Sequence, residues 1–527
     1  MDVNTCGNTT LMFAFSCRRS LCLALVAVSL IATSCESASP KVDGPHAVLR
    51  PTTATLQDVL TRHHKAIVAL FRPSQVRLGT VNAQGSTGTF RQQVMDGDFS
   101  ESFEVGGRKF ALGKRRDQQW NQDSNGVVTL RDDTQCDRLL ELQGSPGIGT
   151  VALVGETTAQ DTAYVVEVRG AGGCHEWAFY DKQTFLTTRS EEAHPGGHVV
   201  DTYSYRRGGN IAWTWGHYHR SDGYQPNDED LDINTESLSA PIKRSDLDIP
   251  QSHINFVQFP QGKSTVALPT RLVAGRIIAK VMIAGRSYDF QVASESAAVW
   301  INLHLAKKLG LQMFGEWAKL PTGEYYRQEA LMPEMRVGDL ILRNLVVGIS
   351  PSAATPTIPT LEGGLGFDFI ASAVLKVDYR IGAVEAIDPQ RFVPPAHAVR
   401  LATEWADGTP RFVLRLDGTP AKFILATSMP NSIIMSSFGH AHPDAISGQE
   451  PSELTQWVQA LRNGGDYSLR PVHAKSLKIG TFNYTNIRMF EVNRDYVAAE
   501  HDGILGDDLL HLYTVYIDFN DKAIYLI

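Results

Sequence analysis

The sequence predicts a mainly β protein with a curved antiparallel sheet and one helix on the N-terminal side, followed by two tandem β-barrel lobes. Three observations support this class. Residues 75–219 contain short alternating segments separated by turn residues such as Gly208-Gly209-Asn210. An amphipathic stretch before them predicts the helix. The C-terminal half repeats one pattern of strands and turns, as a duplicated domain does.

Length and composition limit the class of protein. The chain has 527 residues, of which 43% are hydrophobic and 20% charged, so it is long enough for several packed domains. Its net charge of -8 argues against a nucleic-acid partner, which calls for a basic surface. We expect the chain to divide into a signal peptide at 1–35, a linker at 36–50, the sheet domain at 51–250, and two lobes at 251–392 and 393–527.

The N-terminus has the features of an export signal. Arg18 and Arg19 precede an apolar run that ends at Ala32, and small residues then lead to Cys35. The stretch Ala32-Thr33-Ser34-Cys35 resembles a bacterial lipobox, which implies lipidation of Cys35 and a membrane anchor. The alternative is signal cleavage nearby without lipidation. Both predict an exported protein, periplasmic or tethered to a membrane as a lipoprotein.

Two cysteines remain in the mature chain, Cys136 and Cys174. In an oxidising compartment an even pair predicts a disulfide, and two free buried thiols are the alternative. No Cys/His set has zinc spacing, and His217-x-His219 is more typical of two surface residues on one strand than of metal ligands. We expect no metal and no cofactor.

The N-terminal domain begins with the predicted helix, capped by Thr53 or Thr55 and running to about Phe71. One helix followed by a long antiparallel meander resembles the curved, half-open sheet of lipoprotein carriers and lipid-binding lipoproteins of the periplasm. That resemblance implies an apolar ligand groove. The alternative, a structural domain with a filled core, is favoured because no residue marks a ligand.

The C-terminal half contains the repeat. Gly366 and Gly506 are 140 positions apart (366 to 506), and so are Asp378 and Asp518 (378 to 518). Each glycine follows an apolar strand, and each aspartate lies near the end of a closing strand. The repeat therefore predicts two lobes of the same fold.

Residues 288–311 of the first lobe predict a specific order of elements. Tyr288, Phe290 and Val292 alternate as on a half-buried strand, and a turn follows at 293–296. We expect a second strand at 298–301 and then a short helix from Leu303 to Leu309, closed by Gly310. The predicted order is therefore strand, turn, strand, helix.

This order resembles the active-site stretch of the retropepsin-like aspartic proteases, and the resemblance covers residues 254–527 as two lobes. It implies a cleft between the lobes and a catalytic aspartate in each turn. The family's Asp-Thr-Gly positions are filled in this chain by Ala293, Ser294 and Glu295 in the first lobe and by Ala426, Thr427 and Ser428 in the second. Both catalytic aspartates are thus replaced by alanine, so no catalytic residue is predicted.

Losing one general acid or base costs about 10²–10⁴-fold in rate, and here both are absent. We therefore expect a pseudoprotease that binds a peptide or protein segment in the cleft without cutting it. One alternative is an active endopeptidase that uses a displaced acid such as Glu295. Another is a lipid-binding envelope lipoprotein whose working part is the N-terminal domain.

Overall fold

The computed structural model describes residues 44–527 except the segments 71–73, 84, 117, 132–148, 159–161, 171–174, 195–196, 209–210, 222, 224, 226–227, 238–240, 253–255, 316–317, 320–324, 327, 351–360, 407, 449–468 and 493–500. The prediction of a mainly β protein is confirmed. The described residues form two compact units. The first takes residues up to 253 together with Phe314–Tyr326, and the second takes Ile254–Met313 and Arg327–Ile527.

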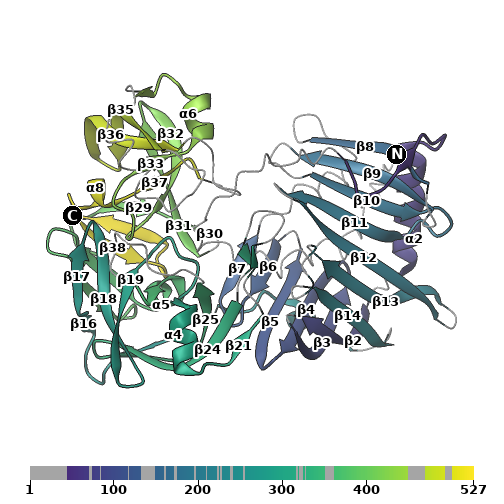
Figure 1. The fold of residues 1–527 in the computed structure, drawn as a ribbon, viewed down its shortest axis with the longest axis horizontal. Coiled ribbons are helices and arrows are strands. Elements are labelled where there is room, and N and C mark those ends of the chain that lie inside the picture. The colour runs from purple at the N-terminus through teal and green to yellow at the C-terminus, as the bar shows by residue number, and fades with distance from the viewer. Residues whose placement is uncertain are drawn as a thin grey trace, which may run out of the picture. The chain divides into compact units, whose positions relative to one another are not determined.

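The first unit is built on one antiparallel sheet of fourteen strands, which bends along its length (Figure 1). Its spatial order is β1-β8-β9-β10-β11-β12-β13-β14-β2-β3-β4-β5-β6-β7. The strands are β1 (Leu49–Arg50), β2 (Ser74–Ala83), β3 (Ser86–Met95), β4 (Asp98–Val105), β5 (Arg108–Arg115), β6 (Gln118–Gln122), β7 (Val128–Arg131), β8 (Gly149–Thr157), β9 (Ala163–Gly170), β10 (His175–Asp181), β11 (Thr187–His194), β12 (Gly197–Gly208), β13 (Ile211–Ser221) and β14 (Glu229–Ser237). Two short elements complete the unit, the 3-10 helix η3 (Arg244–Leu247) and the hairpin of β22 (Ala318–Lys319) and β23 (Tyr325–Tyr326).

The helix predicted before the sheet is α2 (Leu56–Leu70). Thr55 caps it, since its Oγ1 accepts a hydrogen bond of 3.2 Å from the backbone N–H of Asp58. Its apolar stripe places Val59 and Leu60 against Val166, and Ala178 and Tyr180 belong to the same core. This packing is the reason the stripe of apolar residues repeats with helical spacing.

Sequence patterning did not identify five of the strands of this sheet, β1, β7, β8, β11 and β14. The segment of β14 reads as acidic, yet Leu231 and Ile233 alternate with Asp230 and Asp232 and are buried, as is Glu229 on the same face. Because β14 pairs with both β13 and β2, it joins the two halves of the sheet. Most of the strand's charge lies on the face that is less buried, while Leu231 and Ile233 enter the hydrophobic core of the sheet.

The second unit contains the repeat, as a first lobe (β15 to β28) and a second lobe (β29 to β39). The first lobe has β15 (Val257–Gln258), β16 (Thr265–Ala267), β17 (Thr270–Val273), β18 (Arg276–Ile283), β19 (Arg286–Val292), β20 (Trp300–Asn302), α4 (Leu303–Leu309), β21 (Met313–Phe314), β24 (Gln328–Val337), β25 (Leu340–Ser350), β26 (Gly363–Leu365), α5 (Phe367–Ala371), β27 (Val374–Asp378) and β28 (Ala383–Ile387). The second lobe has β29 (Val399–Ala402), β30 (Glu404–Ala406), β31 (Thr409–Leu416), β32 (Thr419–Leu425), β33 (Ile433–Ile434), α6 (Ser436–Ala441), β34 (Ile446–Gly448), β35 (Leu469–Ile479), β36 (Phe482–Val492), β37 (Gly503–Leu505), α8 (Asp507–Leu510), β38 (Thr514–Asp518) and β39 (Ala523–Leu526).

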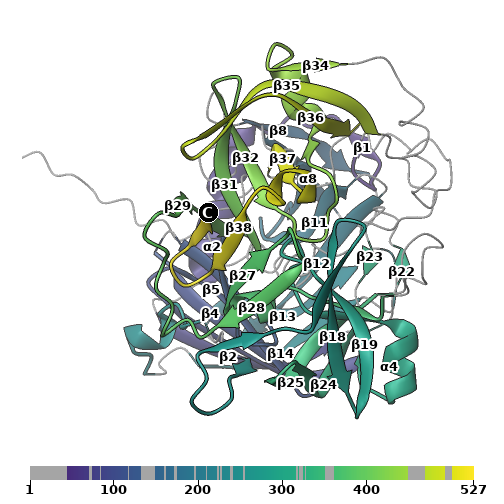
Figure 2. The same ribbon diagram turned by 90° about the vertical axis from the view of Figure 1, so that its left-hand side faces the viewer.

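A sheet of six strands joins the two lobes, in the order β16-β28-β27-β38-β39-β29 (Figure 2). Three strands come from each lobe, and the middle pair, β27 and β38, runs antiparallel with Val377 opposite Val515 and Leu375 opposite Ile517. All four of these side chains are buried. Shared backbone hydrogen bonds therefore fix the two lobes to each other.

The same local pairing recurs in each lobe. β19 runs parallel to β26, with Val292 opposite Leu365, and β32 runs parallel to β37, with Leu425 opposite Leu505. The second strand expected at 298–301 is shorter and later than predicted, since β20 covers only Trp300–Asn302. The hydroxyl of Ser296 donates to the carbonyl of Ala298 at 2.8 Å, so the chain is still turning there.

Candidate functional site

The six turn residues singled out in the sequence come together where the lobes meet. Each turn leaves one of the paired strands just described. The backbone N–H of Ala293 donates to the carbonyl of Leu365, and that of Ala426 donates to the carbonyl of Leu505, both at 3.0 Å. Each turn is thus anchored to the apolar-Gly strand of its own lobe, in the same register.

Ser294 and Thr427 lock the two turns to each other by reciprocal hydrogen bonds. The N–H of Ser294 donates to Oγ1 of Thr427 at 3.0 Å, and the N–H of Thr427 donates to Oγ of Ser294 at 3.1 Å. Each hydroxyl then donates to the other lobe: Ser294 to the carbonyl of Leu425 at 2.6 Å, and Thr427 to that of Val292 at 2.8 Å. Both side chains are fully buried, so the set forms a closed, satisfied network between the lobes.

The positions directly before the two lock residues have no acid-base group. Ala293 and Ala426 are both 0% exposed and present only methyl groups. Hydrolysis by an acid pair needs two carboxyls close enough to share one proton. These two positions therefore supply neither the base that would activate a water nor the acid that would polarise a carbonyl.

Glu295 carries a carboxyl and directly follows Ser294 of the lock. Oε1 accepts a hydrogen bond from the hydroxyl of Ser428, and Oε2 is buried without a partner. Burial raises the pKa of Glu295 above its ordinary value, against the opposing effect of hydrogen bonds from Ser428 and of the charge of Arg276. The residue lies at the boundary between the lobes and is not a freely solvated turn charge.

Neither Glu295 nor Ser428 has a left-handed backbone, so the turn needs no glycine at either position.

Other acids near the turns have structural roles. Asp289 forms a two-bond ion pair with Arg271, at 3.0 and 2.8 Å, and this partner lowers the pKa of its carboxyl. Asp368 accepts the N–H of Val299 at 2.9 Å, and its repeat mate Asp508 accepts the N–H of Ser432 at 2.9 Å. These carboxylates hold the chain that follows each turn, and none replaces a missing catalytic acid.

Sequence reasoning missed a cluster of polar groups beside Glu295. We call Arg276, Glu295, Tyr379 and Asp507 the polar flank. Tyr379 is fully buried, and its hydroxyl has no hydrogen-bond partner. Oδ1 of Asp507 is also a buried atom without a hydrogen-bond partner. Burial raises the pKa of Tyr379 well above its usual range, and the charges of Glu295 and Asp507 raise it further.

Two positions that the repeat matches to the polar flank, Phe367 and Phe519, pack with Trp405 in what we call the aromatic flank. Their ring centroids lie 5.6 Å (Phe367 to Trp405), 5.1 Å (Phe367 to Phe519) and 5.0 Å (Trp405 to Phe519) apart. Such separations are those of packed aromatic side chains. The repeat spacing could have revealed the contrast, because it places Phe367 opposite Asp507 and Phe519 opposite Tyr379.

The remaining predicted residues lie elsewhere. Cys35, Cys136 and Cys174 are outside the described residues. Both histidines of the His217-x-His219 pair bond to acids on β14: His217 to Asp232 at 2.9 Å and His219 to Asp230 at 2.8 Å. Within the described ranges, no group of three His, Cys, Asp or Glu side chains is placed to hold a metal ion.

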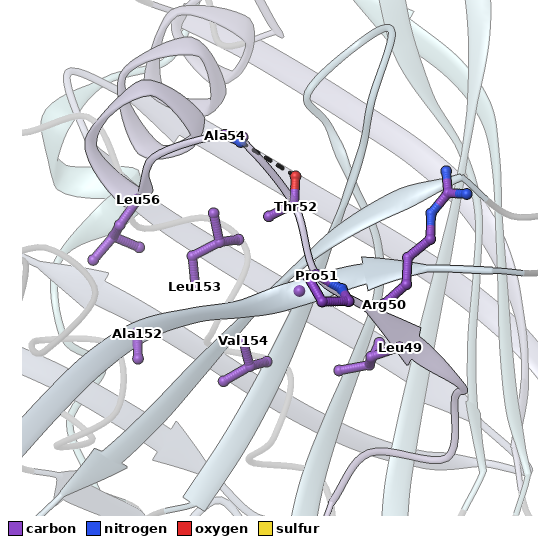
Figure 3. A pocket seen from close by; sticks show the side chains of 10 residues that line it. Leu49, Arg50, Pro51, Thr52, Ala54, Leu56, Ala152, Leu153 and Val154 are labelled. Carbon is purple, nitrogen blue, oxygen red and sulfur yellow. Dashed lines mark hydrogen bonds between the residues drawn. The ribbon is translucent and has the colours of Figure 1, made fainter.

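The first unit has a pocket of about 670 Å³ beside the start of α2 (Figure 3). Its lining is mostly apolar and comes from two stretches of chain, listed here: Leu49, Arg50, Pro51, Thr52, Ala54 and Leu56, then Ala152, Leu153, Val154 and Gly155. The side chain of Thr52 faces the helix start, where its hydroxyl accepts the N–H of Ala54 at 3.3 Å. The pocket is the size of a small-ligand site.

Elsewhere in this unit, polar side chains fill a buried region of the sheet. Arg77 donates to Glu236 at 2.8 Å and to Gln92 at 2.7 Å, and Gln92 donates to Glu101 at 2.5 Å. Arg77, Gln92 and Glu101 are at most 2% exposed. A charged, hydrogen-bonded interior of this kind differs from an apolar groove.

In the part of the chain that the structure describes, no helix combines the length and the apolar character needed to cross a bilayer.

Comparison with known proteins gives distant likenesses. No family model and no curated protein matches the chain. Among solved structures, a DUF1329 family protein from Desulfovibrio piger is 10% identical over 37% of this chain and 98% of its own, with a TM-score of 0.28. A LolA superfamily protein from Nitrosomonas europaea is 14% identical over 37% of this chain and 98% of its own, with a TM-score of 0.27. A retropepsin-like aspartic protease from Rickettsia conorii is 16% identical over 24% of this chain and 89% of its own, with a TM-score of 0.19. Likenesses at this distance assign no activity.

Proposed function

We propose that this is an exported envelope protein whose second unit binds an extended polypeptide segment between two lobes and does not cleave it. The observation that carries the proposal is the lock between the turns. Ser294 and Thr427 bring the two lobes together as mates, while Ala293 and Ala426 leave the meeting point without an acid pair. In this proposal the two lobes bind the segment between them and lack the acid pair that hydrolysis needs.

Binding and cleavage can be separated by one experiment. The full chain would be incubated with a library of unstructured peptides at pH 4 and pH 7, passed through a size-exclusion column, and the retained peptides sequenced by mass spectrometry. We expect a subset of peptides to be retained at full length. Recovery of shortened peptides, or retention of none, would contradict the proposal.

A second candidate function is hydrolysis by Glu295, and its position at the lock favours it. A carboxyl whose pKa is raised holds its proton closer to neutral pH, as a general acid does. It would have to act as a single carboxyl, with the hydroxyl of Ser428 as its hydrogen-bonded neighbour. Turnover that disappears in Glu295→Gln and survives in the exposed-turn variant Asp417→Asn would support this function.

A third candidate is the binding of a lipid or other apolar ligand by the first unit, and the pocket beside α2 is the observation that favours it. Solvent extraction of the purified full chain followed by lipid mass spectrometry tests it. A bound acyl chain that is lost on Leu153→Glu would support it, while an extract without lipid would count against it.

A further inference from the structure

The two flanks of the lobe boundary are structural mates, although their chemistry differs. The turn of each lobe's first hairpin packs on the other lobe through a glycine of positive φ, Gly275 (74°) and Gly408 (73°). A Cβ built on Gly275 would lie 3.1 Å from Oδ2 of Asp507, and one built on Gly408 would lie 3.1 Å from Cβ of Phe367. The same contact is thus made to the carboxylate of Asp507 on one flank and to the Cβ of Phe367 on the other.

The polar flank contains three buried oxygen atoms without partners: Oε2 of Glu295, Oδ1 of Asp507 and the hydroxyl of Tyr379. The aromatic flank has one comparable atom, Nε1 of Trp405. A buried polar atom without a partner destabilises a fold by about 1–3 kcal/mol. Three of them on the flank whose mate is aromatic therefore point to a ligand that satisfies them.

The charges of the polar flank indicate what that ligand is. Arg276 is half-buried, and no carboxylate of the described residues lies within 4.0 Å of it. With two acids and one base, the flank has a surplus of one negative charge when both acids are ionised. A ligand with one positive charge would neutralise it, whereas an anion would face both carboxylates.

A primary ammonium group matches both the charge and the number of hydrogen bonds. It donates three N–H bonds and accepts none, and the flank offers three oxygen atoms that lack partners. A metal ion fits less well, because the described residues contain no group of three metal-binding side chains. Glu295, Asp507 and Arg276 are each only partly buried, so solvent reaches the edge of this flank.

We propose that the polar flank is a specificity site that binds a primary ammonium group, at Glu295, Asp507 and Tyr379, supplied by a lysine side chain or a free N-terminus of the bound polypeptide. This inference deepens the proposed function and rests on it for the source of the ammonium group. The site itself consists of this chain's own atoms and can be tested with a small probe.

The first experiment uses n-butylammonium, with n-butanol and butyrate as neutral and anionic probes of similar shape. Binding to the full chain would be followed by ligand-observed NMR at constant ionic strength. We expect saturable binding of n-butylammonium and at least tenfold weaker binding of the other two. Equal binding of all three probes, tighter binding of butyrate, or no binding to the folded protein would overturn the inference.

Variants locate the probe. Asp507→Asn and Glu295→Gln should each weaken n-butylammonium binding at least tenfold, and Asp507→Phe, which copies the mate position Phe367, should abolish it. Asp507→Asn keeps the shape of the side chain and removes only its charge, so it tests the site independently of the larger substitution. The control is Asp417→Asn, an acid in the turn between β31 and β32, which should leave binding unchanged; a loss equal to that of Asp507→Asn would show a general charge effect and overturn the assignment.

Two peptides distinguish the sources of the ammonium group. One has a free N-terminus and no lysine, and the other is N-acetylated with a single lysine. The peptide that supplies the group should lose at least tenfold in affinity when its amine is acetylated. If n-butylammonium binds and no peptide does, the proposed function fails and the ammonium site stands. If peptides bind equally well with all amines acetylated, the ammonium site fails and the proposed function stands.

Discussion

The two flanks of the lobe boundary show how a duplicated fold can diverge at matched positions. On the aromatic flank, Phe367 and its neighbours pack ring against ring. On the polar flank, Asp507 and Tyr379 occupy the mate positions and keep buried atoms without partners. The lock between Ser294 and Thr427 is almost symmetric by contrast. The residues that join the lobes are equivalent in both copies, while the positions beside them are polar on one flank and aromatic on the other.

The largest effect should come from restoring acids to both turns. The variant Ala293→Asp/Ala426→Asp, made together with Glu295→Gly and Ser428→Gly, should raise peptide cleavage at acid pH by about 10²-fold or more over native protein. The reason is that the lock already holds the two positions as mates. Cleavage would be measured with a fluorogenic peptide mixture.

The control for this variant carries only Glu295→Gly and Ser428→Gly and should remain inactive. If the variant with all four substitutions folds correctly and cleaves no peptide, the two turns do not place their aspartates close enough to act as a pair.

Exchanging residues between the flanks should have the next largest effect. Phe367→Asp should lower the free energy of unfolding by about 3–5 kcal/mol, because it removes a buried ring and places a charge in an apolar cluster. Asp507→Phe should leave stability unchanged or raise it by about 1 kcal/mol, because it removes a buried atom without a partner. Urea denaturation measures both. Equal losses in the two variants would remove the distinction between the flanks.

Breaking the lock should cost less than placing a charge among aromatic rings. Thr427→Val keeps the shape of the side chain and should lower the free energy of unfolding by about 2 kcal/mol, since it leaves the N–H of Ser294 and the carbonyl of Val292 unpaired. Ser294→Ala should lower the free energy of unfolding by less in the Thr427→Val background than in the native protein, because the two residues share one network. Additive losses in this double-mutant cycle would mean that the two halves of the lock act independently.

The smallest effect concerns pH and Glu295. Burial raises the pKa of Glu295 above 4.5, so the folded protein keeps its proton over a range in which the unfolded chain has released it. The free energy of unfolding should therefore fall as pH rises from about 4.5 through the folded pKa. Glu295→Gln should reduce this slope in a series of urea titrations from pH 4 to pH 8. A slope that is the same in the variant would assign the pH dependence to other groups.

Much of this fold could be predicted from local pattern. The alternation of Tyr288, Phe290 and Val292 located β19, and Thr55 and the apolar stripe of α2 located the helix. The repeat spacing placed Ser294 and Thr427 at equivalent positions, which is where the structure shows them bonded to each other. These features depend on neighbours in the sequence or on a repeated spacing.

The rest depends on contacts between distant parts of the chain. The polar flank joins Arg276, Glu295, Tyr379 and Asp507, which four separate stretches supply, and no single stretch marks them as buried. β14 escaped notice because most of its residues are polar or acidic and only two apolar residues, Leu231 and Ile233, enter the core. Burial of this kind is a property of the folded chain, and a sequence window does not contain it.

The central claim is that the mated turns form a binding unit without a catalytic acid pair, and the most direct test is a cleavage assay on native protein. The full chain and its Glu295→Gln variant would be incubated with the same fluorogenic peptide mixture at each pH from 3 to 8. We predict no cleavage by either protein at any pH, while peptides remain bound. Cleavage by the native protein that disappears in Glu295→Gln would contradict the claim and make Glu295 the acid of an active hydrolase.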